Sequence, residues 1–128
     1  MQCLDPNDEH FDELRLMEEQ LGSFRTLRGK PYRLVPLPMA KPVFDKKAGR
    51  LPATYANFLV TNGAVLMPTY DEYETDLLAK QQLQKAFPHH DIVGIDCRPL
   101  IIQHGSLHCS TMQFPVGTMR QRENERLR

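Results

Sequence analysis

The sequence lacks an excess of charge of either sign, a long apolar run and a signal-peptide pattern. Lysine and arginine together number 16, and so do aspartate and glutamate. The chain therefore has no net positive charge that would attract nucleic acid or an anionic membrane surface. No apolar run approaches the roughly 20 residues that cross a bilayer. The amino terminus shows neither the basic nor the apolar region of a signal peptide. We therefore expect no nucleic-acid partner and no membrane partner.

Cysteine is also scarce. The chain has only Cys3, Cys97 and Cys109, an odd number without the spacing of a disulfide framework. This usage favours a reducing, cytoplasmic location. A length of 128 residues suits one folded unit and is too short for two ordinary domains. We expect that unit to occupy residues 1–117, with a mixed-charge tail over residues 118–128.

The amino-terminal part predicts a helix, a short strand and a long loop. Asp5–Glu9 supplies capping side chains and negative charge suited to a helix start, and Gly29 is a plausible stop. Residues 32–37 predict a strand. Residues 38–53 contain three prolines and no periodicity, so we expect a loop, either a functional lid or a solvated connection. The predicted helix has apolar residues at three- and four-residue steps: Phe11, Leu14, Met17, Leu21 and Phe24.

The middle of the chain predicts a β-hairpin followed by a second helix. Residues 54–60 and 64–68 predict strands, and Asn62-Gly63 between them favours a type I′ turn. Asp71 and Glu74 resemble a capping box, with the helix running to about residue 87. Asn57 falls in mid-strand, where its side chain needs hydrogen-bond partners if buried; a neighbouring loop would supply them without any catalytic role.

The last part holds a candidate nucleophile. Residues 91–95 predict a strand, Gly105-Ser106 predicts a turn, and residues 107–114 predict another strand. Cys109 would then lie near a strand start, just past a tight loop. A thiol held there can face a cleft and act as a nucleophile. The alternative is an inert core cysteine, which is common in half-buried strands.

A metal site is a further alternative. His104, His108, Cys97 and Cys109 are possible ligands, but there is no Cys-x-x-Cys pair. Alternation along a strand would also turn His108 and Cys109 to opposite faces. We therefore expect no metal and no cofactor. The order of elements predicts an α/β fold in which a helix–strand unit is repeated about twice, and such repeats bury their faces against further copies.

Four motifs in order resemble the carboxy-terminal part of agmatine deiminases and Porphyromonas-type peptidylarginine deiminases. The resemblance extends from the first helix to Pro115. It implies a five-fold pseudosymmetric α/β propeller of the pentein type, of which this chain would hold about two repeats. The motifs occupy residues 51–58, 62–68, 87–96 and 107–111.

The resemblance also implies a chemistry. Cys109 would be the nucleophile that attacks a guanidinium carbon, Asn57 and Gly105 would contribute to substrate binding, and His104 is a possible acid or base. The substrate would be a small guanidine such as agmatine, in putrescine and polyamine biosynthesis, or peptidyl-arginine. The agmatine deiminase branch has Gly-Gly-Gly-Asn before the His-Cys pair, whereas this chain has Gln-His-Gly-Ser at residues 103–106; this difference weakens the case for agmatine in particular.

The resemblance further implies a His-x-Asp pair on a strand upstream of the first helix, and another acidic residue further upstream still; residues 1–128 start too late to include them. We therefore expect residues 1–128 to be inactive alone. The apolar surfaces that pack against the other repeats would be exposed in this chain. We expect either those repeats or a second copy in a homo-oligomer to bury them. The alternative is a truncated, non-catalytic module that serves binding or assembly.

Overall fold

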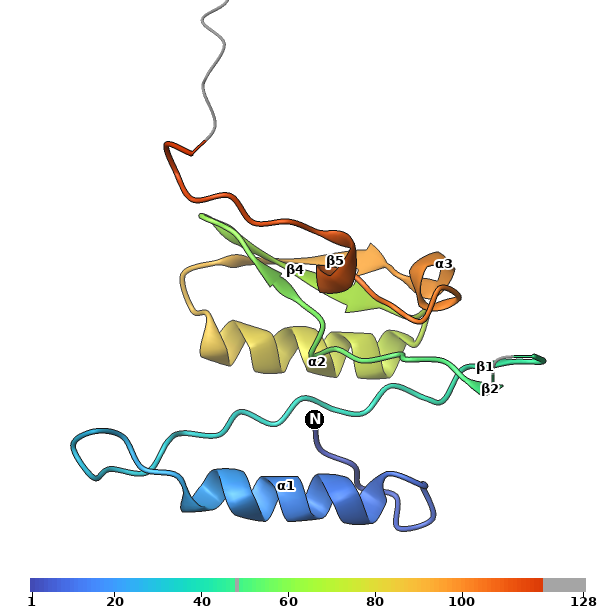
Figure 1. Cartoon of the computed structure of the whole chain (residues 1–128), viewed down its shortest axis with the longest axis horizontal. Coiled ribbons are helices and arrows are strands. Elements are labelled where there is room, and N and C mark those ends of the chain that lie inside the picture. The colour runs from blue at the N-terminus through green and yellow to red at the C-terminus, as the bar shows by residue number, and fades with distance from the viewer. Residues whose placement is uncertain (48, 119–128) are drawn as a thin grey trace, which may run out of the picture.

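The computed structural model describes residues 1–47 and 49–118 and has an α/β fold (Figure 1). The fold class predicted from the sequence is confirmed at this level. The elements in chain order are α1 (Phe11–Ser23), β1 (Phe44–Asp45), β2 (Gly49–Arg50), β3 (Leu59–Val60), β4 (Ala64–Thr69), α2 (Tyr73–Ala86), β5 (Asp91–Asp96), α3 (Arg98–Ile101) and a 3₁₀ turn at His108–Ser110.

The main sheet has the strand order β3-β4-β5. β3 and β4 form an antiparallel hairpin, and β4 and β5 are parallel, joined by α2. The hairpin confirms the prediction from Asn62-Gly63, but the type I′ turn is wrong, because neither residue has a positive φ. The first strand is also shorter than predicted, since residues 54–58 form a turn and irregular chain.

The core lies where α2 packs on the sheet. Val65 and Met67 of β4 and Ile92 of β5 face Ala79 and Leu83 of α2, and all five are buried. Alternation along the strands places these sheet residues on one face. Residues from the loops complete the core: Leu37, Ala40, Leu51, Tyr55, Tyr70, Cys97, Ile101 and Leu107.

The start of α2 differs from the predicted capping box. Neither Asp71 nor Glu74 caps the helix; Asp71 instead has a left-handed φ of 64°. Asp76, inside the first turn, accepts hydrogen bonds from the backbone N–H groups of Tyr70 (3.2 Å) and Glu72 (3.1 Å). A carboxylate at this end satisfies donors that lack helical partners and favours the helix dipole.

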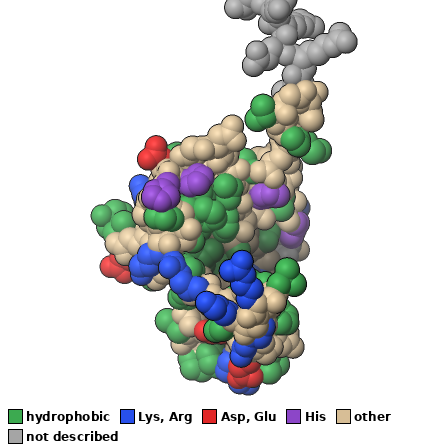
Figure 2. Space-filling view, turned by 90° about the vertical axis from the view of Figure 1, so that its left-hand side faces the viewer, with side chains coloured by type: hydrophobic (Ala, Val, Ile, Leu, Met, Phe, Trp, Pro, Cys, Tyr) green, Lys and Arg blue, Asp and Glu red, His purple; other side chains and the backbone are tan. Residues whose placement is uncertain are grey.

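The amino-terminal region is built around α1, which begins and ends inside the predicted limits. Residues 31–37 run extended beside α1 but form no strand, so that prediction is wrong. A single parallel bridge joins Gln2 to Pro38. Figure 1 shows this extended segment between α1 and α2, and the Arg33 guanidinium donates to the Lys85 carbonyl of α2 at 2.7 Å. Lysine and arginine side chains gather around this junction in the end view of Figure 2.

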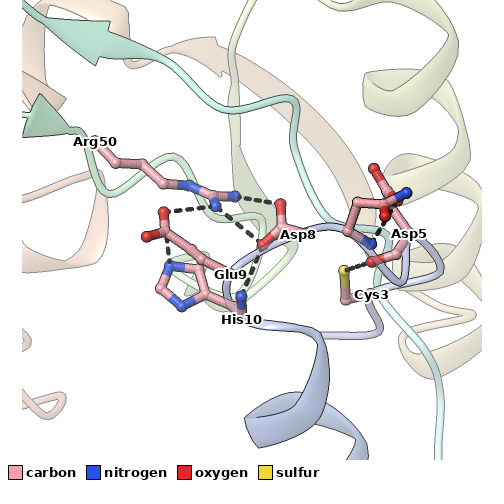
Figure 3. A network of polar contacts seen from close by, with 7 residues as sticks. Cys3, Asp5, Asp8, Glu9, His10 and Arg50 are labelled. Atoms are coloured by element: carbon pink, nitrogen blue, oxygen red, sulfur yellow. Dashed lines mark hydrogen bonds and ion pairs between the residues drawn. The ribbon is translucent and has the colours of Figure 1, made fainter.

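Residues 38–53 are not the featureless loop that was predicted, because β1 and β2 pair within them. Arg50 at the end of β2 ties this hairpin to the turn before α1 (Figure 3). Its guanidinium donates to both carboxylate oxygens of Asp8, at 3.0 and 2.9 Å, and to Glu9 at 3.0 Å. Asp8 also accepts the backbone N–H of His10, and the Arg50 guanidinium holds the pKa of the Asp8 carboxyl below its usual value.

The carboxy-terminal part departs most from prediction. Residues 107–114 form no strand; a 3₁₀ turn at His108–Ser110 is followed by irregular chain to residue 115. Most of the predicted tail, residues 119–128, lies outside the described residues. None of the described helices is long and apolar enough to cross a membrane.

Candidate active site

Cys109 is exposed and lies in the 3₁₀ turn that follows the Gly105-Ser106 loop. Asn57 lies in the chain just before β3, and the structure brings these two residues together although 52 positions separate them in the sequence. The backbone N–H of His108 donates to the Asn57 carbonyl at 3.2 Å. The two segments therefore approach through both backbone and side-chain contacts.

The Asn57 side chain holds Cys109 at two points. Its Nδ2 donates to the Cys109 Sγ at 3.1 Å, and its Oδ1 accepts the Cys109 backbone N–H at 3.3 Å. The second bond fixes the orientation of the amide, because an oxygen must face the backbone donor. The amide N–H is consequently aimed at the sulfur.

This arrangement favours the thiolate. The backbone N–H of Ser106 and the Asn57 side chain lower the pKa of the Cys109 thiol; burial opposes them to a lesser degree, and the backbone N–H of Cys109 itself adds a small lowering effect. Hydrogen bonds to the charged form of a group stabilise that form. Since the thiolate is the reactive species of cysteine, these donors make the Cys109 thiol more reactive, and none of them is a cation.

Gly105 allows the loop to close over the cysteine. A Cβ added at Gly105 would lie 3.3 Å from the Cys109 Cβ, a tight contact for two carbon atoms. The absence of a side chain at Gly105 therefore lets residues 105–106 approach Cys109. Ser110 also braces the loop by donating from its hydroxyl to the Ser106 carbonyl at 3.1 Å.

A buried hydroxyl lies beneath both segments. The Tyr70 Oη accepts the Thr54 backbone N–H (2.9 Å), donates to the Thr54 carbonyl (3.0 Å) and shares a hydrogen bond with the Ser106 Oγ (2.9 Å). Tyr70 is 3% and Ser106 1% exposed, and burial raises the pKa of the tyrosine hydroxyl. The hydroxyl therefore remains a neutral donor and acceptor at ordinary pH.

Tyr55 and Cys97 lie near this hydroxyl but make other contacts. The Tyr55 hydroxyl donates to Asp76 at 2.7 Å, and its ring meets Tyr70 edge-on with 5.6 Å between centroids. Burial raises the pKa of the buried Cys97 thiol, and the Ser106 side chain offsets part of that rise. Cys97 is thus an inert core residue, whereas Cys109 is exposed. Tyr70 and Ser106 were not predicted as site residues, and no spacing in the sequence indicates them.

His104 lies in the same loop, with a left-handed φ of 59°. It lines an open groove of about 450 Å³ together with Met1, Glu9, His10 and Arg50. His108 is exposed in the 3₁₀ turn, so the strand alternation that was expected to separate it from Cys109 does not apply. Within the described ranges, no group of three or more His, Cys, Asp and Glu side chains is placed to hold a metal ion.

An exposed cysteine whose sulfur receives neutral hydrogen-bond donors, carried by loops at the edge of an α/β sheet, defines a candidate site for cysteine-based nucleophilic catalysis. The sequence model of the Porphyromonas-type peptidyl-arginine deiminase family matches residues 1–115. The chain belongs to this family, as its motifs predicted.

Individual relatives agree with this assignment. A putative agmatine deiminase from a Marinomonas species is 34% identical over 88% of this chain and 35% of its own length. The crystal structure of a putative arginine deiminase from Porphyromonas gingivalis is 56% identical, with a TM-score of 0.88 over 93% of this chain and 34% of that one. A substrate-bound cysteine-to-serine variant of C. jejuni agmatine deiminase is 38% identical, with a TM-score of 0.73 over 85% of this chain and 30% of that one. The chain thus spans about one third of the length of these relatives.

Proposed function

We propose that this chain is the carboxy-terminal portion of a guanidine deiminase in which Cys109 is the nucleophile. The observation that carries the proposal is the exposed Cys109 sulfur, which accepts the Asn57 amide at 3.1 Å. Family membership supports the reaction class, since the relatives are named agmatine and arginine deiminases. A guanidinium carbon is a poor electrophile because its charge is delocalised, and a soft thiolate is a suitable nucleophile for it.

The reaction would follow two steps. The Cys109 thiolate forms an S–C bond with the guanidinium carbon, and the tetrahedral adduct takes up a proton and expels ammonia, leaving a thiouronium on the sulfur. Water then adds to that carbon and gives up a proton, and the C–S bond breaks to release a urea product and restore the thiolate. The first step needs an acid and the second a base, and one histidine can serve both.

The other predicted site residues take supporting roles in this proposal. Asn57 would orient and activate the sulfur and remain beside the bound guanidinium, and Gly105 would leave room for the substrate next to Cys109. His104 is the acid or base candidate within this chain, but its groove is lined by Arg50 and Glu9 rather than by Cys109. The geometry therefore favours an acid and base supplied by sequence beyond these residues, as the family resemblance implies.

The substrate would be a free or peptide-linked guanidine. Relatives named for agmatine and for peptidyl-arginine both lie within the family, so agmatine and peptidyl-arginine are the two classes to test. Agmatine would give N-carbamoylputrescine, a step toward putrescine. No cofactor enters this chemistry, and a cytoplasmic location suits a reduced cysteine.

The chain would form about two repeats of a five-fold α/β propeller. Two helix crossovers support this: α2 joins parallel β4 and β5, and α1 joins Gln2 to the extended segment at Pro38 through a parallel bridge. The remaining repeats, or a second copy of the chain, would cover the exposed apolar side chains of α1. Residues 1–128 alone would be inactive, because the residues that clamp the guanidinium lie elsewhere.

Covalent labelling tests the proposal. The complete protein that carries this chain is treated with a haloacetamidine or with the neutral haloacetamide of the same shape, and the modified cysteines are identified by mass spectrometry. We expect Cys109 to react faster with the amidine, and Cys3 to show no such preference. Equal rates of Cys109 modification by the two reagents would overturn the assignment of a guanidinium site. They would favour the alternative that the chain is a non-catalytic module. Release of ammonia from agmatine by residues 1–128 alone would contradict their predicted inactivity.

A further inference from the structure

Two polar groups of other residues lower the pKa of the Cys109 thiol: the Asn57 amide, which donates to the sulfur at 3.1 Å, and the backbone N–H of Ser106. They come from different segments of the chain. Asn57 belongs to residues 54–57, before β3, and Ser106 belongs to the loop after α3. Each segment is irregular backbone, and neither is paired in the sheet. Something else must therefore hold the two donors at a fixed separation, because a displacement of a few tenths of an ångström weakens a hydrogen bond to sulfur.

One buried atom contacts both segments. The Tyr70 Oη bonds to the backbone N–H and carbonyl of Thr54, three residues before Asn57, and to the hydroxyl of Ser106. Tyr70 directly follows β4, the central strand of the sheet. Its backbone is therefore held by a strand that is paired on both sides. The edge-on contact with Tyr55 further limits the ring.

We propose that Tyr70 and Ser106 are positioning residues for Cys109: the Tyr70 hydroxyl fastens the Asn57 segment to the Ser106 loop, and so sets the two donors that stabilise the thiolate. This inference rests on the proposed nucleophilic role of Cys109. Neither residue touches the reacting sulfur with its side chain. Ser106 acts through its backbone N–H, whose place is fixed by the hydroxyl on the same residue.

The chain offers a matched control. Tyr55 is as deeply buried as Tyr70, lies against it and donates its hydroxyl to a single partner. That partner is Asp76 at the start of α2, which also accepts the Tyr70 backbone N–H at 3.2 Å but bonds to neither donor of the sulfur. Tyr55→Phe and Tyr70→Phe thus remove the same buried atom type from adjacent rings, but only the second disconnects the two segments around Cys109.

The experiment measures the pH dependence of Cys109 alkylation by neutral iodoacetamide in the full 128-residue chain, with modification read by mass spectrometry at each cysteine. Tyr70→Phe is expected to raise the thiol pKa and to slow alkylation near pH 7 by about three- to tenfold, since one pKa unit changes the thiolate fraction tenfold. Tyr55→Phe, which loosens the Asn57 segment from α2 but not from the Ser106 loop, is expected to shift the profile clearly less than Tyr70→Phe. Ser106→Ala, which keeps the backbone N–H but frees the loop, should slow alkylation by about two- to threefold.

Equal profiles for Tyr70→Phe and Tyr55→Phe would overturn the inference. If Tyr70→Phe does not fold, Ser106→Ala decides: an unshifted thiol pKa in that variant overturns the inference, and a raised one supports it. The readout is independent of guanidine turnover. A shifted pKa together with no amidine preference at Cys109 would therefore support the positioning roles and reject the proposed deiminase site.

Discussion

The two long helices of this chain have similar lengths but opposite surroundings. α1 has 13 residues and α2 has 14, and each connects two segments that run parallel. α2 buries Ala79 and Leu83 against the sheet, whereas α1 has no buried residue. The region around α2 also carries the candidate active site, while the region around α1 is attached to it mainly through the extended segment and polar contacts.

The difference lies in what each helix packs against. β4 and β5 are joined by six registered residue pairs and present a continuous apolar face. The segments flanking α1 share one bridge and offer few buried side chains. The apolar stripe of α1 therefore stays partly exposed, with Met17 at 47% and Leu21 at 40%. Local sequence determines that a helix forms, but a neighbouring sheet determines how much the helix contributes to stability.

The largest expected effect comes from truncating matched leucines in the two helices. Leu83 is 2% exposed and Leu21 is 40% exposed. Leu83→Ala removes a fully packed side chain and leaves a cavity, so we expect a loss of about 2–5 kcal/mol in the free energy of unfolding. Leu21→Ala should change it by less than about 1 kcal/mol, since little burial is lost and alanine favours the helix. Urea unfolding followed by circular dichroism measures both.

Similar losses for the two variants would contradict the comparison. They would mean that α1 is covered in solution, for example by a second copy of the chain. Repeating Leu21→Ala at several protein concentrations separates these cases, because the cost of losing an intermolecular contact depends on concentration.

The sequence predicted the elements that rest on local periodicity. Both long helices, the hairpin at Asn62-Gly63 and the strand predicted over residues 91–95 are present. Two strand predictions failed, because residues 32–37 and 107–114 have strand-like composition but no partner strand among the described residues. The helix start at Asp71 failed for another reason: the carboxylate at this end is that of Asp76 inside the first turn, which accepts the backbone N–H groups of Tyr70 and Glu72.

The candidate site was predictable only in part. Cys109 and Asn57 emerged from the resemblance, and the structure places them in contact, although their roles stay predictions. The strand predicted for each of these residues was wrong, since both lie outside strands. Tyr70 and Ser106 could not be predicted, because the fold alone brings a hydroxyl after β4 to a loop 36 residues away. Such contacts between distant segments leave no periodic trace in a single sequence.

A smaller effect is expected from the ion pair that attaches β2 to the start of α1. Asp8→Asn keeps an oxygen for the His10 N–H but removes the charge facing Arg50. The two side chains are 13% and 16% exposed, so we expect a loss of about 1 kcal/mol at neutral pH. Because Arg50 lowers the Asp8 pKa in the fold, this stability is present above the unfolded pKa of about 4 and disappears as pH falls through the lower folded value.

Glu9→Gln is the control for this pair. Glu9 contacts the same guanidinium at 3.0 Å, but its side chain is 60% exposed. Urea unfolding at neutral pH should show a smaller loss for Glu9→Gln than for Asp8→Asn. The loss caused by Asp8→Asn should shrink as pH falls below about 4 and disappear once the pH is below the lowered Asp8 pKa of the folded chain. An equal loss for both variants at neutral pH would show that burial of the pair does not set its contribution.

The smallest expected effect lies on α1 itself, where Arg15 and Glu19 form an exposed i,i+4 pair at 2.6 Å. Glu19→Gln should cost no more than about 0.5 kcal/mol at low salt, because both side chains are well hydrated and flexible. The cost should fall further at high salt, where exposed charges are screened. Urea unfolding at the two ionic strengths measures it, beside Asp8→Asn as the less exposed reference. A larger loss than for Asp8→Asn would show that the surface of α1 is packed against something, and the contrast between the two helices would then have to be abandoned.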